Sequence, residues 1–501
     1  MKFSNVADTL WGHKARFSYL LIASGILLLT MLGAREIWTQ EHRWADIVSG
    51  MFYRHDFLHP YLGITRYYDK PLLSYWLIAM IASLTGELST WALRLPSALA
   101  GILAIGSIVS IGTSVRNRSL GLLSGWLLLT TFYFLFWART SSADMLNVGG
   151  SLFAIAWYFR KRMATSILDY TIFFLIVALT SLCKGLIGAI VPAIAIATDI
   201  WLQQSWKRHF NKSLFLAMIP AAVLYFLPFW ASSHFGGQSY GQSGLYLVYR
   251  ENILRYFQPF DHQGPIYTYL VYLPIYLLPW AVFFIPAFIQ LPSRWRSMTT
   301  DTKWIAWTLL FLFLFFTMSG SRRSYYVLPL VPFAILLTAD WILSTAKRGK
   351  YAAITVIATF CLLWTAMDVV QGWYYSQVGV NRFAVTLKNA ASEIKPWNQW
   401  KVVMLDAESK LNFYLQLPPD APHLSIKGLR ADQTAATLSE RWTILQNKPE
   451  HTIFVTRKMY AAMLQPYFQG YQMVEAPALP FQLPLLKKHD INSPVAFIPN
   501  N

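Results

Sequence analysis

The stretch that decides the fold runs from residue 93 to residue 138. It reads LRLPSALAGILAIGSIVSIGTSV over 93–115, then RNR, then SLGLLSGWLLLTTFYFLFWA over 119–138. Each apolar segment has the length of about 20 residues that an α-helix needs to cross the hydrocarbon core of a bilayer. Two apolar segments joined by a short basic loop are typical of membrane helices that meet on the cytoplasmic side.

Apolar segments of this kind recur along the chain and predict eleven membrane spans in all. The remaining nine are predicted at 19–34, 145–159, 170–183, 186–202, 213–231, 268–291, 303–318, 325–343 and 352–371. A further apolar stretch, 72–85, is short for a crossing and suits an interfacial or re-entrant helix. The number of spans becomes thirteen if this stretch and one other also cross.

The distribution of charge supports this topology. Only 13% of the residues are charged and 55% are hydrophobic, although 42 Lys and Arg against 24 Asp and Glu give a net charge of +18. If the N-terminus is cytoplasmic, the basic clusters at 116–118, 160–162, 207–212, 294–296 and 347–350 all fall on the cytoplasmic side. The basic excess therefore sets orientation, and we do not expect nucleic acid as a partner.

The C-terminal part has a different composition and predicts a second domain. Short apolar bursts alternate with polar loops after residue 371, with strand-like segments at 401–405 and 452–455 and helical spacing at 435–445. We predict an all-α polytopic membrane domain over 1–371, whose first outer loop covers about 35–92. A small α/β domain over 372–501 would then lie in the periplasm, and the protein would be a multi-pass protein of the cell inner membrane.

Positive charges on the outer side break the usual rule and so indicate function. They are Arg35, Arg43, Arg54, Arg66, Lys70, Arg139, Lys184, Arg250, Arg255, Arg322 and Arg323. Any one of them is equally explained as part of a hydrated loop with mixed charges. Lys184 is different, because it lies between two tight spans and needs a counter-anion or a water cavity. Asp144 likewise lies at the boundary of a span. A lipid phosphate bound by cations from several loops would explain the pattern.

Several segments carry a family resemblance in both order and spacing. The segments QEHRWAD at 40–46, YYDKPLLSYW at 67–76 and ALRLPS at 92–97 are similar to those of GT-C glycosyltransferases of the bacterial 4-amino-4-deoxy-L-arabinose transferase type, which are related to protein O-mannosyltransferases. Later segments at 139–145, 184–185, 250–252, 261–265 and 321–332 also resemble that family. The resemblance covers roughly residues 17–345.

This resemblance implies an integral membrane enzyme of the GT-C fold. It implies that a sugar moves, with inversion, from a polyprenyl-phosphate donor to an acceptor on the periplasmic face. The acceptor would be lipid A, another surface glycan or a protein hydroxyl, and membrane lipids would be further partners. The alternative is a non-catalytic polyprenyl-phosphate-sugar binding protein or a transporter. Transporters usually carry charges near mid-membrane and paired repeats, whereas these charges cluster on one face.

The general base is the point at which the sequence departs from the family pattern. The leading Asp of the first loop is Gln40 here, and an amide cannot accept a proton at neutral pH. Either Glu41, Asp46 or Asp144 then serves as the base, or the enzyme is impaired. We favour Glu41, which matches the family's second acid, with Asp144 in support. The alternative for Glu41 is a loop ion pair with Arg43 or another outer cation.

The remaining site residues follow from the same resemblance. Donor phosphate binding is predicted for Lys70, Lys184, Arg322, Arg323, Tyr326 and Arg43. Lipid headgroup contact is the alternative for the cations, and interfacial anchoring for Tyr326. Other site residues are Gln40, Asp69, Glu251 and His262. Asp69 and His262 match positions where some relatives can hold a divalent ion, but one Asp and one His are a poor ligand set. We predict no required metal or other cofactor.

Overall fold

The computed structural model describes residues 3–38, 40–68, 70–164, 166–235, 244–246, 248–260, 262–377, 379–426, 451–475 and 491–500. The chain divides into two compact units. The bundle unit consists of Met1–Leu32, Phe57–Pro60 and Tyr67–Asp368, and the tail unit of Gly33–Asp56, Tyr61–Arg66 and Val369–Asn501.

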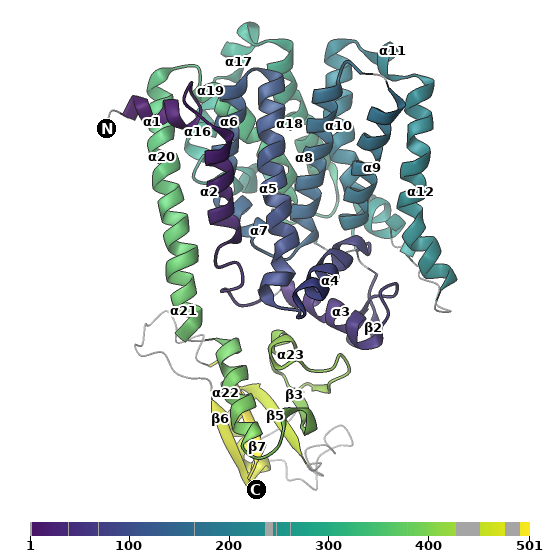
Figure 1. Cartoon of the computed structure of the whole chain (residues 1–501), viewed down its shortest axis with the longest axis vertical. Helices are drawn as coiled ribbons and strands as arrows, with labels where there is room; N and C mark the ends of the chain where they lie inside the picture. The colour runs from purple at the N-terminus through teal and green to yellow at the C-terminus, as the bar shows by residue number, and fades with distance from the viewer. Residues whose placement is uncertain are drawn as a thin grey trace. The chain divides into compact units, whose positions relative to one another are not determined.

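The bundle unit is helical (Figure 1). Its helices are α1 (Phe3–Leu10), α2 (Phe17–Leu29), α4 (Leu73–Thr85), α5 (Thr90–Val115), α6 (Arg118–Leu129), α7 (Phe132–Ala138), α8 (Ala143–Lys161), α9 (Ile167–Lys184), α10 (Ile187–Gln203), α11 (Trp206–His209), α12 (Lys212–His234), η1 (Tyr249–Leu254), α14 (Arg255–Phe257), α15 (Thr268–Tyr276), α16 (Ala281–Ile289), α17 (Leu291–Arg294), η2 (Trp295–Ser297), α18 (Thr300–Met318), η3 (Ser324–Leu330), α19 (Val331–Ile342), α20 (Ala346–Trp364) and η4 (Thr365–Val370), whose last two residues belong to the tail unit.

The polytopic helical architecture predicted from the apolar segments is confirmed. Every predicted span corresponds to a helix or to a pair of consecutive helices. Within the described residues, six helical segments are long and apolar enough to cross a membrane by themselves, or seven with a bent pair counted as one span. Several other spans are shorter or interrupted, for example α2, α10 and the pair α15 and α16. α4 is also short, with 13 residues.

The bent pair shows why one predicted span is broken. The segment 119–138 forms α6 and α7, which meet at an angle of 71°. At the break, the Thr130 hydroxyl donates to the Trp126 carbonyl at 2.7 Å and the Thr131 hydroxyl donates to the Leu127 carbonyl at 2.8 Å. Such side-chain bonds compete with the backbone bonds that would continue a helix. The freed Phe132 N–H donates to the Leu278 carbonyl instead.

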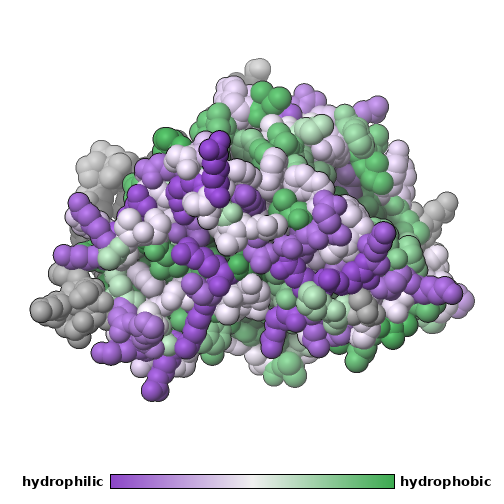
Figure 2. Space-filling view, turned by 90° about the horizontal axis from the view of Figure 1, so that it is seen from above, coloured by the Kyte–Doolittle hydropathy of each residue, from purple (hydrophilic) through white to green (hydrophobic). Residues whose placement is uncertain are grey.

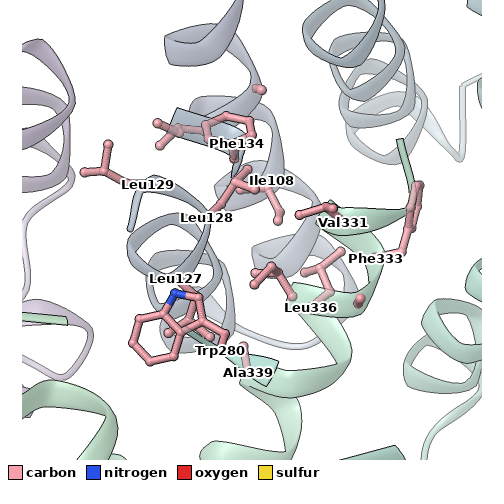
Figure 3. Close-up of a cluster of buried hydrophobic side chains, with 14 of the residues drawn as sticks. Ile108, Leu127, Leu128, Leu129, Phe134, Trp280, Val331, Phe333, Leu336 and Ala339 are labelled. Atoms are coloured by element: carbon pink, nitrogen blue, oxygen red, sulfur yellow. The ribbon is translucent and has the colours of Figure 1, made fainter. Parts of the chain in front are cut away.

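Close packing around α5 holds the bundle together. Small residues allow the backbones to approach, since a Cβ at Gly149 of α8 would lie 2.5 Å from the Ala100 carbonyl oxygen of α5. A buried cluster involves α6, α19 and the residue before α16. Figure 3 shows the Trp280 indole beside Leu127 and near side chains of α19 such as Leu336. Trp280 is fully buried, as are these neighbours.

The tail unit contains the predicted α/β domain. Its strands are β3 (Lys401–Leu405), β4 (His423–Leu424), β5 (Thr452–Arg457), β6 (Tyr471–Glu475) and β7 (Pro494–Pro499), in the order β4-β3-β5-β7-β6. β3 is parallel to β4 and β5, whereas β7 is antiparallel to β5 and β6. The strands predicted at 401–405 and 452–455 are therefore confirmed. The helix predicted at 435–445 lies outside the described residues.

Helices cover both faces of this sheet. Val402 and Met404 of β3 pack with α22 (Val380–Ser392) and α23 (Lys410–Leu415), while Val403 and Leu405 pack on the other side with α25 (Lys458–Leu464) and η8 (Gln465–Phe468). Alternation along a strand buried on both faces produces this three-layer arrangement. α21 (Gln371–Gln377) precedes α22, and η5 (Trp397–Gln399) precedes β3.

The first outer loop is divided between the two units. Its first part forms α3 (Glu41–Arg54) and the hairpin of β1 (Tyr61–Leu62) and β2 (Thr65–Arg66), all within the tail unit. Its second part, including Lys70 and α4, belongs to the bundle unit. The boundary predicted at 371/372 lies close to the one between Asp368 and Val369. The loop, however, was expected to belong to the membrane domain as a whole.

Candidate functional site

An ion pair between Asp144 and Lys184 lies at one end of the bundle. Ser142 caps α8, since its hydroxyl accepts from the Asp144 N–H, so Asp144 occupies the first helical turn. Lys184 is the last residue of α9, which packs along α8. The Lys184 Nζ and Asp144 Oδ1 are 2.5 Å apart, and each side chain is 13% exposed. Asp144 is thus the counter-anion that the sequence required for Lys184.

The turn after Lys184 packs closely against Asn252. Gly185 has a φ of +116°, and a Cβ there would lie 2.6 Å from the Asn252 Oδ1. That oxygen accepts from the Leu186 N–H at 2.9 Å, while the Asn252 amide donates to the Val248 carbonyl at 2.8 Å. Asn252 was not selected as a site residue from the sequence, although its segment 250–252 carried the resemblance.

An aromatic ring lies beside the ammonium group. The Lys184 Nζ lies 5.5 Å from the centre of the Tyr326 ring, within the range of a cation–π interaction. Tyr326 belongs to η3, and the neighbouring Tyr325 packs against Trp137 at 5.0 Å between ring centres. Of the predicted phosphate ligands, the structure therefore brings Lys184 and Tyr326 together with Asp144.

The loops at 262–264 and 321–323 pair with each other. Gln263 and Ser321 form an antiparallel bridge, and the Arg322 N–H donates to the His262 carbonyl at 2.8 Å. Arg323 hydrogen-bonds to the His262 ring and to the Tyr325 hydroxyl, the latter at 2.7 Å. His262, Arg323 and Tyr325 therefore form one polar group, in which His262 faces a cation.

Arg322 serves a different purpose from Arg323. Its Nε and Nη2 donate to the Thr317 carbonyl at 3.1 and 2.9 Å, and its Nη1 donates to the Gly264 carbonyl at 2.7 Å. The guanidinium therefore joins the end of α18 to the loop at 262–264. These hydrogen bonds favour a structural role for Arg322, in which it holds the two segments together. Binding of the donor phosphate by Arg322 stays a prediction.

Glu251 pairs within its own helix. The Arg255 Nη1 and Glu251 Oε2 are 2.5 Å apart, and the Arg255 Nε donates to the Ser321 hydroxyl at 3.3 Å. Glu251 is therefore connected through Arg255 to the loop that carries Arg322 and Arg323. This connection was not visible in the sequence.

Arg139 and Asp368 form a second pair that the sequence did not indicate. The Arg139 Nη1 donates to the Leu27 and Thr30 carbonyls at 2.6 and 2.9 Å, at the C-terminal end of α2. Its Nη2 lies 3.4 Å from the Asp368 Oδ1. Both side chains are 7% exposed. Asp368 lies inside the apolar segment 352–371, and an acid at such a position was the available signal.

In the tail unit, the Glu41 carboxylate forms a hydrogen bond and an ion pair with residues that precede it in the chain. Gln40 precedes α3 and Glu41 begins it. The Glu41 Oε2 accepts from the Trp38 N–H at 2.8 Å and pairs with the Arg35 Nη2 at 3.3 Å, and the residue is fully buried. This is the ion-pair alternative for Glu41, with Arg35 as one cation. A carboxylate in this position joins the turn before α3 to the first residue of the helix and neutralises Arg35.

Asp46 lies one and a half turns further along α3 and has a different environment. Burial raises the pKa of Asp46 from its ordinary value to about 7. Within the described residues, no salt bridge involves Asp46. A carboxyl group with a pKa near neutrality can both accept and release a proton at physiological pH. A pKa near neutrality is compatible with a general base, so Asp46 stays a candidate together with Glu41 and Asp144.

The other predicted residues lie as follows. Arg43 is in the first turn of α3, and Lys70 precedes α4 in the bundle unit; both are half-buried and have polar partners. Asp69 lies outside the described residues. Among the residues that the structure describes, no group of three or more His, Cys, Asp or Glu is placed to hold a metal ion.

Comparison with known proteins agrees with the resemblance. The family described as dolichyl-phosphate-mannose-protein mannosyltransferase matches residues 69–231. An undecaprenyl phosphate-alpha-4-amino-4-deoxy-L-arabinose arabinosyl transferase of Pseudomonas aeruginosa is 26% identical over 337 residues, which are 64% of this chain and 58% of that relative. One from Shewanella sediminis is 26% identical and covered to 63%. This chain therefore spans less than two thirds of the length of the curated relatives it matches.

A solved structure extends the likeness to nearly the whole chain. The crystal structure of ArnT from Cupriavidus metallidurans bound to undecaprenyl phosphate matches with a TM-score of 0.70 and 15% identity, covering 96% of this chain and 97% of that one. The predicted helical membrane fold with a small C-terminal α/β domain is thus confirmed, and it is similar to the fold of that ArnT structure.

Proposed function

We propose that this chain is an inverting membrane glycosyltransferase that moves a sugar from a polyprenyl-phosphate donor to an acceptor. The observation that carries the proposal is the arrangement of Lys184, Asp144 and Tyr326 at one end of the bundle. The names of the relatives, which describe transfer from undecaprenyl phosphate, support the same reaction. The acceptor class remains lipid A, another surface glycan or a protein hydroxyl.

In the proposed reaction, the acceptor oxygen attacks the anomeric carbon of the donor sugar from the face opposite the phosphate. The bond between that carbon and the phosphate oxygen breaks, and its electron pair stays on the lipid phosphate. The proton of the acceptor passes to a carboxylate, for which the candidates are Glu41, Asp46 and Asp144; we favour Asp46, because burial raises its pKa to about 7. Lys184 and Arg323 supply positive charge and hydrogen bonds to the departing phosphate.

We further propose that the site faces the periplasm of a cell with an inner membrane. Asp144 and Lys184 lie at the opposite end of α8 and α9 from the basic residues Lys161 and Arg162. Figure 2 views the bundle from the end where α11 and α17 lie, and hydrophilic side chains gather there. Basic residues mark the cytoplasmic end of membrane helices. The N-terminus would then be cytoplasmic and the C-terminal domain periplasmic.

Reconstitution in proteoliposomes tests the proposal. The donor is undecaprenyl phosphate-α-4-amino-4-deoxy-L-arabinose, the acceptor is lipid A, and mass spectrometry follows the released undecaprenyl phosphate and the gain in mass of lipid A. Other polyprenyl-phosphate sugars and acceptors are tested in parallel. Release that depends on an acceptor supports the proposal. If the protein binds these donors but releases no undecaprenyl phosphate with any acceptor, it is a binding protein or a transporter instead.

A further inference from the structure

The segment that leads into α3 is held by the C-terminal part of the chain. Within the tail unit, the Glu36 carboxylate accepts from the Val380 N–H and pairs with the Lys410 Nζ at 3.0 Å. Gly379, with a φ of +123°, leaves room for this contact, because a Cβ there would collide with the Glu36 carboxylate. A residue near the start of the chain is thereby fixed to residues more than 340 positions later.

α23 provides two of these contacts from one face. Lys410 reaches Glu36, and one turn later the Tyr414 hydroxyl oxygen accepts from the Ile37 N–H at 2.9 Å. α3 itself packs against α23. Beyond α23, a Cβ at Gly50 of α3 would lie 3.8 Å from the Pro419 side chain, so the chain after α23 also follows α3 closely.

The ion pair is largely shielded from water, which makes it a firm attachment. The Lys410 and Glu36 side chains are 23% and 13% exposed. Burial alone would lower the pKa of Lys410, but Glu36 and Glu408 outweigh it and raise that pKa above its ordinary value. Lys410 therefore stays charged, and neutralising it leaves Glu36 half-buried without this cation.

We propose that Lys410 and Tyr414 are positioning residues for the transfer reaction, acting through Glu36 and Ile37 to fix the place of α3. α3 carries Asp46 and Glu41, the acids of the first outer loop. Within the tail unit, the C-terminal domain would then hold the helix that carries two of the three candidate bases. This inference rests on the proposed function for its catalytic meaning, but the attachment itself can be measured without turnover.

The test uses the full-length protein in proteoliposomes and a matched pair of lysine variants. Lys410→Met removes the attachment, whereas Lys458→Met removes the pair between Lys458 and Glu475, which is 3.3 Å long and about 40% exposed on both sides. We expect Lys410→Met to lower kcat about 10- to 100-fold, the range that a small misplacement of a catalytic group produces. The Kd for undecaprenyl phosphate should stay unchanged, and Lys458→Met should match wild type in both.

Hydrogen exchange supplies the second readout. Amides of α3 should exchange faster in Lys410→Met than in wild type or Lys458→Met, and Lys410→Arg should restore both protection and kcat. Tyr414→Phe, which removes one acceptor with little change in volume, should give a smaller effect in the same direction. It also keeps the test decisive if Lys410→Met does not fold.

Several results would overturn the inference. One is unchanged exchange of α3 in both Lys410→Met and Tyr414→Phe. Another is faster exchange without a fall in kcat, which would leave the attachment purely structural. A third is an equal loss of activity in Lys458→Met. If wild type itself transfers no sugar, the proposed function fails, whereas the exchange data still decide whether α23 holds α3.

Discussion

Asp144 and Asp46 are both acids of the predicted site, but their surroundings are opposite. Asp144 begins a helix of the bundle and lies 2.5 Å from the Lys184 ammonium group. Asp46 is half-buried on α3 of the tail unit, and this burial raises its pKa to about 7. The Asp144 carboxylate holds that cation in place. A carboxylate deprived of water and of a cation can exchange its proton, which a general base must do.

Substitution of Asp46 should have the largest effect on transfer. Asp46→Asn keeps the shape of the side chain but cannot accept a proton, so transfer should fall about 100- to 10,000-fold. Donor binding should persist, because the cations are untouched. Turnover and the Kd for undecaprenyl phosphate are measured on the same reconstituted sample. An Asp46→Asn protein with wild-type kcat would return the base to Glu41 or Asp144.

Removing the partner of Asp144 should have the next largest effect. Lys184→Met leaves Asp144 shielded without its cation, which costs about 3–5 kcal/mol of folding free energy in comparable buried pairs. It should also lower transfer about 100- to 1,000-fold, as removal of one group that stabilises developing charge does. The double variant Asp144→Asn with Lys184→Met should regain thermal stability but not transfer. Recovery of both would make the pair structural only.

Variants of Arg323 and Arg322 test which of these arginines binds the donor phosphate. Arg323→Gln removes a charge that lies beside His262 and Tyr325, and donor affinity should weaken about 10-fold. Arg322→Gln should chiefly lower the melting temperature, because its guanidinium is occupied by the Thr317 and Gly264 carbonyls. Equal losses of affinity in the two variants would remove the distinction between ligand and clamp.

The pH dependence sharpens the role of Asp46. Since only its ionised form accepts a proton, kcat should rise with pH up to about 7 and level off above it. One pH unit below that value, the rate should be about tenfold lower. Because the folded state holds the proton more tightly than the unfolded chain, Asp46 should lower stability as the pH rises between its ordinary value and about 7. Asp46→Asn should abolish this contribution in pH-dependent thermal unfolding.

The smallest expected effect concerns metal ions. Treatment with a chelator should leave turnover unchanged, because lysine and arginine provide the positive charge at the donor phosphate. Restoration of lost activity by added divalent ions would show that a metal does part of the work assigned to Lys184 and Arg323. Turnover with and without chelator at constant ionic strength provides the measurement.

Sequence reasoning identified the spans and the need of Lys184 for an anion, because both follow from local hydrophobicity. It did not find which acids pair with distant arginines. Three predicted spans contain a single acid near one end, and each of these acids reaches an arginine far along the chain. Asp199 pairs with Arg162, Asp340 with Arg116 and Arg294, and Asp368 with Arg139. We interpreted the basic clusters as signals of orientation only, whereas several of their arginines also join helices.

The base was harder to predict for a related reason. Spacing and resemblance place Glu41 and Asp46 on one segment, but their protonation depends on surroundings that only the tertiary fold supplies. The Glu41 carboxylate contacts Arg35 and the Trp38 amide. For Asp46, by contrast, burial raises the pKa. The division of the first outer loop between the two units was equally invisible, since Glu36 and Lys410 are separated by 374 positions.

The assignment of part of the first outer loop to the tail unit affects the order in which the protein folds during synthesis. The ribosome makes residues 33–66 before most of the membrane helices and long before α23, on which α3 rests. During synthesis this segment must therefore wait, incompletely packed, while the remaining spans are inserted. Its final structure forms only after α23 has been synthesised, so folding of the tail unit is coupled to synthesis of the C-terminal part of the chain.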